Sequence, residues 1–310
     1  MINKIDKVAI IILNYNGYKD TIECLNSLMR LSCSSVYVSV FIIDNGSTNS
    51  SVDEIIKWMK YNIKDFSIIH KEEKITSQVA FYIGTKNLGF SGGNNIGIRL
   101  AEKSGMDYVL LLNNDTVVDS NFLEPLLEVA RSDSRIGIVG SKIIDYFHRD
   151  HYILGGYLSL KKCSGYHFYN TERANRGKLS FTSGCIWLLP IHVFKKCGLM
   201  DPKYFLYVED VDFCYNVSSH GYIITCNKDS VIYHKEGQSS IIKPTVAYYN
   251  TRNRLYFSNK VKGHIFSKSY FYIYFFVTRI LKIIRNPSLA KYIGKGILDY
   301  RRKFYGKYNS

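Results

Sequence analysis

Short apolar runs alternate with longer amphipathic segments along the first half of the chain. The runs are rich in Val, Ile, Leu and Phe, as expected for strands buried in a sheet. In the longer segments apolar residues recur three and four positions apart, which is the period of a helix. The expected strands cover residues 8–13, 36–44, 66–69, 81–83, 108–112 and 136–139, and the expected helices cover 18–31, 49–61, 92–104 and 120–131. Strands that alternate with helices predict βαβ units and an α/β fold with a mostly parallel sheet.

The pattern weakens between residues 145 and 178, where glycines and a mixture of Tyr, His and charged residues predict irregular loops with room for a hairpin. Regular structure is expected again after residue 181, and Pro190 is expected at the first position of a short helix. Beyond Pro244 the sequence predicts two or three basic helices. The expected elements between these points are a strand over 185–189, helices over 190–198 and 208–220, and a strand over 222–233.

Charge divides the chain into two parts. Residues 243–310 contain 15 Lys or Arg and a single acid, Asp299. The whole chain has 41 basic and 26 acidic side chains, so residues 1–242 carry 26 and 25 and are nearly neutral. We therefore expect one domain over residues 1–242 and a basic helical tail over residues 243–310, whose partner would be anionic.

The cysteines and the apolar segments exclude several classes of protein. The seven cysteines include no Cys-x-x-Cys pair, so neither a zinc site nor a redox motif is indicated, and we expect reduced thiols in a cytosolic chain. The apolar run at residues 8–13 is too short for a signal peptide and leads directly into a turn at Asn14–Gly17. No uncharged stretch is long enough to span a bilayer.

Two acidic motifs each come directly after an apolar or aromatic run of the sequence. Asn113-Asn114-Asp115 follows the strand over 108–112, and Glu209-Asp210 with Asp212 follows an aromatic run. In an open α/β sheet, ligand-binding side chains gather at the carboxyl ends of the strands. Carboxylates at such an edge can hold a divalent cation or act as a general base. Taken singly, each motif also fits a structural role, as a cap before Thr116 or as acids that stabilise a helix dipole.

Three further segments carry candidate chemistry. Asp44 ends the second strand, where it could accept the imide N–H of a pyrimidine base or simply form an Asx-turn. The Gly-rich segment 87–97 opens a helix and would let a nucleotide approach the backbone, although it lacks the ending of a P-loop and follows the fourth strand. His234 ends a strand and fits a metal ligand, a phosphate donor or an ordinary surface histidine.

Together these motifs resemble those of the inverting glycosyltransferases of family 2, in particular the rhamnosyltransferase-like members. The resemblance implies the GT-A fold and covers residues 8 to about 240. Asn113 departs from the family pattern, because it stands where the family has the first Asp of Asp-X-Asp, so a bound metal would gain less negative charge. The matching segments, in the family's order, are 12–17, 44–48, 87–95, 112–115, 183–184, 209–212 and His234.

The resemblance implies a role for each matched residue. Asp210 falls at the catalytic base, and Asp44 at the contact to uracil or thymine. Asp115 falls at the metal-binding acid, and His234 at a histidine that helps to ligate Mg²⁺ or Mn²⁺ in some members. The remaining residues expected at the donor are Asn14, Asn16, Asn87, Gly93, Asn94 and Asn114, and those expected to contact or support the acceptor are Gly184, Glu209 and Asp212.

The resemblance also implies a reaction. Processive synthases of the family carry a Gln-X-X-Arg-Trp segment and membrane spans, whereas Trp58 and Trp187 are the only tryptophans here and neither follows an Arg. We therefore expect non-processive transfer of one sugar from a nucleotide-diphospho-sugar to a glycan or lipid-linked acceptor, in surface polysaccharide or lipid-linked glycan assembly. The nucleotide loop alone points to rhamnose from a thymidine diphosphate donor.

The tail indicates where the protein acts. An aromatic run at residues 270–277 precedes Arg279, Lys282 and Arg285 at helical spacing, which suits the anionic surface of a membrane. We expect a cytoplasmic protein held peripherally at the inner face of the cell membrane, with no nucleic acid partner. Alternatively, the aromatic residues pack onto the catalytic domain, or the tail binds nucleic acid by stacking on bases. The sequence leaves the oligomeric state open.

A sugar-nucleotide pyrophosphorylase is the alternative enzyme, since it shares the alternation of strands and helices. It would require a basic Gly-rich loop after the first strand to hold a triphosphate. The segment Asn14–Tyr18 occupies that place and has no Lys or Arg. The sequence therefore favours the transferase.

Overall fold

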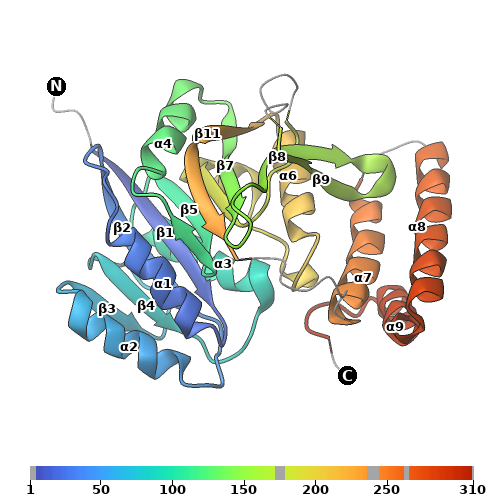
Figure 1. Cartoon of the computed structure of the whole chain (residues 1–310), viewed down its shortest axis with the longest axis horizontal. Helices are drawn as coiled ribbons and strands as arrows, with labels where there is room; N and C mark the ends of the chain where they lie inside the picture. The colour runs from blue at the N-terminus through green and yellow to red at the C-terminus, as the bar shows by residue number, and fades with distance from the viewer. Residues whose placement is uncertain (1–4, 172–178, 236–243, 262–264, 309–310) are drawn as a thin grey trace.

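The computed structural model describes residues 5–171, 179–235, 244–261 and 265–308. These residues form one mixed sheet of eleven strands with helices on both faces (Figure 1). The strands are β1 Asp6–Asn14, β2 Val36–Asp44, β3 Phe66–Ile69, β4 Val79–Ile83, β5 Tyr108–Asn113, β6 Thr116–Val118, β7 Ile136–Asp145, β8 Tyr152–Ser159, β9 Ser164–Tyr169, β10 Ile186–Pro190 and β11 Ile223–His234. The helices are α1 Tyr18–Leu28, α2 Ser51–Asn62, α3 Gly89–Lys103, α4 Leu123–Ser132, α5 Ile191–Cys197, α6 Glu209–Ser219, α7 Pro244–Lys260, α8 Ile265–Arg285 and α9 Ala290–Arg301.

The strand order is β3-β4-β2-β1-β5-β10-β7-β11-β6, and β8 and β9 extend from β7 as an antiparallel hairpin. The strands from β3 to β5 are all parallel, so their carboxyl ends meet at one edge. In this register Asn14 lies opposite Asp44, and Leu13 lies opposite Asn113. The register therefore places three of the predicted polar segments side by side.

Two apolar cores cover the two faces of the sheet. Successive residues of β1 alternate between them, because neighbouring side chains of a strand point to opposite faces. Ile10 and Ile12 join Leu25 of α1 in one core, whereas Ile11 packs in the other. The second core also contains Phe257 of α7. The helix that follows residue 243 therefore contributes to the same core as the first strand.

The structure confirms the predicted α/β architecture and departs from it in detail. β10 runs antiparallel to both β5 and β7, so the sheet is no longer parallel beyond β5 in this order. Pro190 was expected to begin a helix, but it ends β10 opposite Tyr108, and the helix begins at Ile191. The strand continues to this residue because the N–H of Ile191 donates to the carbonyl of Asp107. The hairpin between residues 145 and 178 is present as β8 and β9, and the short strand β6 was not predicted.

Figure 1 shows α7, α8 and α9 grouped at the end of the molecule opposite α2 and β3. The inner face of α8 is buried through Phe271, Phe275 and Arg279. Among the described residues, no helix combines the length and the apolar character needed to cross a bilayer. The division of the chain at residue 242 remains a proposal.

Candidate active site

The ends of β1 and β2 form a tightly bonded corner. Asn14 Nδ2 donates to Asp44 Oδ1 at 2.8 Å and to Ser47 Oγ at 3.1 Å. Asp44 Oδ2 accepts the N–H of Ser47, three residues further along, at 2.9 Å. The side chain therefore holds the turn after β2, although by a longer-range bond than that of the Asx-turn predicted as an alternative, which would use the N–H of Gly46. A carboxylate can accept about four hydrogen bonds. Asp44 therefore holds its own turn and keeps capacity for a ligand N–H, although its side chain is only 1% exposed.

Asn16 joins the turn after β1 to the turn after β2. Its backbone is left-handed, at φ 57°, and its N–H donates to Ser47 Oγ at 2.9 Å. Its side-chain oxygen accepts the N–H of Thr48 at 2.8 Å. Asn16 therefore shapes the rim of the corner, and its side chain is exposed there.

The Gly-rich segment is attached to this corner by Asn45. The side-chain oxygen of Asn45 accepts the N–H of Leu88 at 2.9 Å, and its Nδ2 donates to Asn87 Oδ1 at 3.1 Å. Two other predicted donor residues face the protein instead of the edge of the sheet. A Cβ on Gly93 would lie 2.3 Å from Leu13 Cδ1, and Asn94 is buried and donates to the carbonyl of Phe90.

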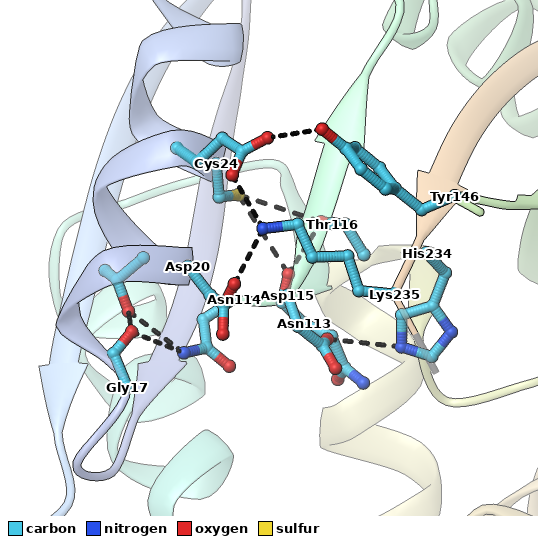
Figure 2. A network of polar contacts seen from close by, with 12 residues as sticks. Gly17, Asp20, Cys24, Asn113, Asn114, Asp115, Thr116, Tyr146, His234 and Lys235 are labelled. Atoms are coloured by element: carbon cyan, nitrogen blue, oxygen red, sulfur yellow. Dashed lines mark hydrogen bonds and ion pairs between the residues drawn. The ribbon is translucent and has the colours of Figure 1, made fainter. Parts of the chain in front are cut away.

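The structure brings Asp115 and His234, the two residues expected at a cation, into contact (Figure 2). His234 Nε2 lies 3.1 Å from Asp115 Oδ1. Burial alone would raise the pKa of Asp115, but the hydrogen bond and charge of His234 outweigh it and lower that pKa below its usual value. Burial disfavours the imidazolium of His234, yet the neighbouring Cys185 and Asp115 groups raise its pKa to about 11.

A carboxylate oxygen and an imidazole nitrogen at this separation fit a divalent cation, which would have to displace the proton that His234 otherwise carries. Two adjacent ligands of an octahedral ion, with bonds of about 2.1 Å, lie about 3 Å apart. Within the described part of the chain, no three His, Cys, Asp or Glu side chains gather into a metal site. Asp115 and His234 would therefore supply two ligands, and phosphate oxygens and water would have to supply the others, as is usual for Mg²⁺ at phosphate sites.

Lys235 forms a cluster beside this pair that the sequence did not predict (Figure 2). Its Nζ lies 2.7 Å from Asp20 Oδ1 and 2.6 Å from Glu23 Oε2, both on α1. Tyr146 donates its hydroxyl proton to the other oxygen of Glu23 at 2.9 Å. The N–H of Lys235 also donates to the carbonyl of Asp115. The cluster therefore fixes the end of β11, and with it His234, against α1.

Asn114 does not face the cation pair. Its Nδ2 donates to Thr21 Oγ1 at 3.0 Å and to the carbonyl of Gly17 at 3.4 Å (Figure 2). A Cβ on Gly17 would lie 2.9 Å from Asn114 Nδ2, so a larger residue there would displace the amide of Asn114. Asn114 therefore ties the loop after β5 to the start of α1.

The segment 183–185 connects the two acidic motifs. The carbonyl of Cys185 accepts the N–H of Asn113 at 2.9 Å, beside the cation pair. A Cβ on the preceding Gly184 would lie 3.3 Å from the Cβ of Asp210. A single short segment thus contacts both motifs, which are far apart in the sequence.

Glu209 and Asp210 line a cavity of about 200 Å³. Burial and the nearby Asp210 charge raise the pKa of Glu209 to about 8, so this carboxyl is protonated at neutral pH. Its Oε2 is buried without a hydrogen-bond partner among the described residues. Asp210 Oδ1 accepts the N–H of Val211 at 2.8 Å. The other lining residues used below are His167 of β9 and Asn250 of α7.

Asp212 lies outside the lining of this cavity. It is buried and pairs with Lys260 of α7 at 2.9 Å. Lys260 also contacts Asp201 at 2.7 Å. The third acid of the motif therefore joins α6 to α7.

A larger cavity of about 600 Å³ extends from His234 along β7, β8 and β9. Its lining includes Tyr152, Tyr169 and His167, and His167 also lines the smaller cavity. Burial lowers the pKa of His167 to about 4, so its ring is neutral. Tyr152, Tyr169 and His167 thus form an aromatic wall of the larger cavity, and His167 also reaches the cavity of the two acids.

Four residues of the site were not predicted from the sequence: Asn45, Lys235, Arg252 and Asn253. Asn45 and Lys235 stand next to the predicted residues Asp44 and His234, and this adjacency was a usable signal. Arg252 and Asn253 bind the segment before α6 from α7. Their composition resembles the rest of the basic tail, so only the tertiary structure reveals them.

Comparison with known proteins identifies the family of the chain. A sequence-family model described as glycosyl transferase family 2 matches residues 9–198. The low-salt glycan biosynthesis hexosyltransferase Agl10 of Haloferax volcanii is 23% identical over 276 residues, which cover 86% of this chain and 78% of the relative. The dTDP-rhamnosyl transferase RfbF of Shigella flexneri is 24% identical over 54% of this chain and 59% of its own length. The mannosyltransferase PcManGT of Pyrobaculum calidifontis, solved with GDP-Man and Mn²⁺, superposes with a TM-score of 0.60 at 10% identity, over 97% of this chain and 84% of that structure.

Proposed function

Because this chain belongs to glycosyltransferase family 2, and is a glycosyltransferase of glycan biosynthesis with the GT-A fold, we propose that it transfers one sugar with inversion. The donor is a nucleotide-diphospho-sugar and the acceptor is a hydroxyl group. The observation that carries the proposal is the segment 183–185, which contacts the loop of Asp115 on one side and Asp210 on the other. A cation site and a base therefore flank the same short stretch of backbone.

Asp210 acts as the general base. It takes the proton of the acceptor hydroxyl while the acceptor oxygen bonds to the anomeric carbon. The bond from that carbon to the diphosphate oxygen breaks in the same step, and the nucleoside diphosphate leaves with the electron pair. A base within hydrogen-bond reach and an oriented donor are sufficient for this displacement, and the sugar never bonds to the protein.

Asp115 and His234 would hold the Mg²⁺ or Mn²⁺ ion. When bound, the ion neutralises charge on the diphosphate leaving group. Asn113 contributes no carboxylate, so this site would have one acidic ligand instead of two. The protonated Glu209 contributes a neutral neighbour to Asp210, and this keeps a second negative charge away from the base.

Two features support the choice of substrates. The donor corner around Asp44 fits a pyrimidine base, and a relative carries the name dTDP-rhamnosyl transferase, so thymidine diphosphate rhamnose is the first donor to test. The aromatic wall of β8 and β9 fits a glycan or lipid-linked sugar, since aromatic rings pack against the apolar faces of sugars.

The proposal is tested with a panel of nucleotide sugars, with and without Mn²⁺. Thermal stabilisation identifies the donor, and release of the nucleoside diphosphate measures turnover. We expect a subset of donors to stabilise the protein in the presence of Mn²⁺ and one of them to be consumed. Absence of stabilisation and turnover across uridine, thymidine and guanosine diphosphate sugars would refute the proposal.

We propose further that the outer face of α8 rests on an anionic membrane, where a lipid-linked acceptor would be found. Ile273, Ile280 and Ile284 are 68%, 55% and 69% exposed and lie on one side of the helix. Figure 1 places α8 at the outer margin of the molecule. The exposed basic residues of α8, α9 and the segment that follows are Lys268, Arg285, Lys291, Arg301, Arg302, Lys303 and Lys307.

Not every basic residue of the tail is available to such a partner. Arg252, Arg254 and Arg279 are buried and donate to groups within the protein. Fewer positive side chains therefore face solvent than the composition indicates, which disfavours binding of nucleic acid through the tail. The apolar stripe of α8 favours a lipid surface, because it can bury Ile side chains that a phosphate backbone cannot.

A further inference from the structure

The segment that leads into Glu209 and Asp210 has an unusual backbone. Phe205, Tyr207 and Val208 have φ angles of 64°, 67° and 74°. Phe205, with ψ at −58°, is the centre of a γ-turn in which the N–H of Leu206 donates to the carbonyl of Tyr204 at 2.8 Å. Residues other than Gly and Asn rarely adopt such angles, and a β-branched Val least of all. Contacts from elsewhere in the fold must therefore impose this course on the chain.

Asn253 supplies three of these contacts. Its Nδ2 donates to the carbonyls of Tyr204, Leu206 and Tyr207 at 3.0, 2.8 and 2.8 Å. The side chain is fully buried, so water cannot substitute for it. One amide group thus binds the segment on both sides of the γ-turn.

Arg252 orients Asn253 and adds contacts of its own. Its Nε donates to Asn253 Oδ1 at 2.9 Å, which turns the Nδ2 group toward the segment. Its Nη2 donates to the carbonyl of Tyr204 at 2.8 Å and to that of Lys203 at 3.2 Å. Arg252 is also fully buried, although it belongs to the basic tail.

The same segment contacts the start of the Gly-rich helix. The carbonyl of Phe205 accepts the N–H of Phe90 at 2.7 Å. A Cβ on Gly89 would lie 2.2 Å from that carbonyl oxygen, so only glycine permits the approach. The course of residues 205–208 therefore determines where the donor loop begins and where the acids enter their cavity.

We infer that Arg252 and Asn253 are positioning residues for the transfer: by binding the carbonyls of residues 203–207 they hold the left-handed segment that presents Asp210 to the acceptor and seats the donor loop. This inference rests on the proposed function. It makes α7 a part of the catalytic apparatus. Neither side chain lines the two cavities described above, so both act through the backbone that they bind.

The inference is tested with Asn253→Ala in the full chain and a nucleotide sugar that the wild type turns over. A displacement of about 1 Å at the reacting groups can cost on the order of 10²-fold in rate. We expect kcat to fall by about 10²-fold and KM for the donor to rise by a smaller factor, because the carbonyl of Phe205 also holds the start of the Gly-rich loop. A purely structural role would lower Tm and leave kcat per folded molecule unchanged, and that result would overturn the inference.

A second substitution tests whether the loss of kcat in Asn253→Ala comes from the strained backbone at residue 208. Val208→Gly in the Asn253→Ala background should restore at least about tenfold in kcat, because glycine adopts φ near 74° without strain. Leu206→Gly is the matched control, since Leu206 does not have a positive φ, and it should restore nothing. Equal recovery by both glycines would overturn the inference. If Asn253→Ala does not fold, Asn253→Ser, whose hydroxyl can donate to one of the three carbonyls, takes its place with the same expected outcomes.

The two proposals fail in different ways. If the wild type consumes no nucleotide sugar, the proposed function fails. If the wild type is active and Asn253→Ala keeps its kcat, only the role of Arg252 and Asn253 fails.

Discussion

His234 Nε2 lies 3.1 Å from Asp115 Oδ1, although 119 positions separate the two residues in the chain. The short strand β6 explains this proximity, because it pairs with β11 and sets Thr116 opposite His234. Asp115 is the residue immediately before that pair. The geometry of the proposed cation site therefore depends on a strand of only three residues.

Asp115→Ala should abolish the dependence of nucleoside diphosphate binding on Mn²⁺, because it removes the only carboxylate of the pair. His234→Ala should weaken the binding by about tenfold or more. Calorimetry of a nucleoside diphosphate with and without Mn²⁺ measures both effects. The control is His70→Ala, an exposed histidine outside the candidate site. Equal affinity of the wild type with and without the ion would remove the cation from the mechanism.

Asp210→Asn should retain the fold and donor binding and lose about 10²–10⁴-fold in turnover, because the amide cannot accept the proton of the acceptor. Release of nucleoside diphosphate at saturating donor measures the loss. Asp229→Asn, at an exposed position of β11, is the matched control and should keep wild-type turnover. Wild-type turnover in Asp210→Asn would show that the acid only stabilises the start of α6.

Glu209→Gln should flatten the dependence of Tm on pH. In the folded protein the pKa of Glu209 is raised from about 4.5 to about 8. The folded state therefore keeps a proton that the unfolded state has lost in this interval, so stability falls as pH rises from 4.5 to 8. The neutral amide removes this contribution. Thermal unfolding between pH 5 and pH 8.5 tests the expectation, with the exposed Glu128→Gln as the control. An unchanged slope in Glu209→Gln would show that Glu209 is ionised in the fold.

Replacing Ile273, Ile280 and Ile284 together by Ser should reduce binding to anionic vesicles by about tenfold or more, since each Ile contributes about 1.5–3 kcal/mol when it is fully buried. Co-sedimentation with vesicles of phosphatidylserine and phosphatidylcholine measures the loss. Tyr61→Ser, which removes an exposed aromatic side chain from α2, should have no effect. Undiminished vesicle binding by the triple variant, or retention on DNA instead of vesicles at matched salt, would refute attachment through α8.

These substitutions are preferable to a truncation after residue 242. Such a truncation would remove Phe257 from the core and Arg252 and Asn253 from the segment before α6. Loss of vesicle binding would then follow from unfolding. The triple Ser variant changes only side chains that are exposed.

The sequence predicted most of the strands because their signal is local. Val36–Asp44 and Phe66–Ile69 were predicted with the bounds that they have in the structure. The strand β6 was not predicted, since three residues between polar turns give no periodicity. Pro190 was misplaced, because its preference for the first turn of a helix competes with the ladder formed by β5 and β10.

The site could be predicted only in part. The proximity of Asp115 and His234 followed from the resemblance to a family, whereas neither spacing nor composition indicates it. Arg252 illustrates the remaining difficulty. A basic residue in a basic tail is expected to face solvent, and its burial against the carbonyls of Lys203 and Tyr204 depends on how α7 packs. Such contacts are tertiary and leave no local pattern.

The contact between Arg252 and the carbonyl of Gly306 has a consequence for synthesis of the protein. The N–H of Gly306 also donates to the carbonyl of Lys203, at the start of the segment that leads to Asp210. A nascent chain cannot close these contacts until residue 306 has left the ribosome. Activity would therefore be acquired late in translation, after every strand of the sheet has been synthesised.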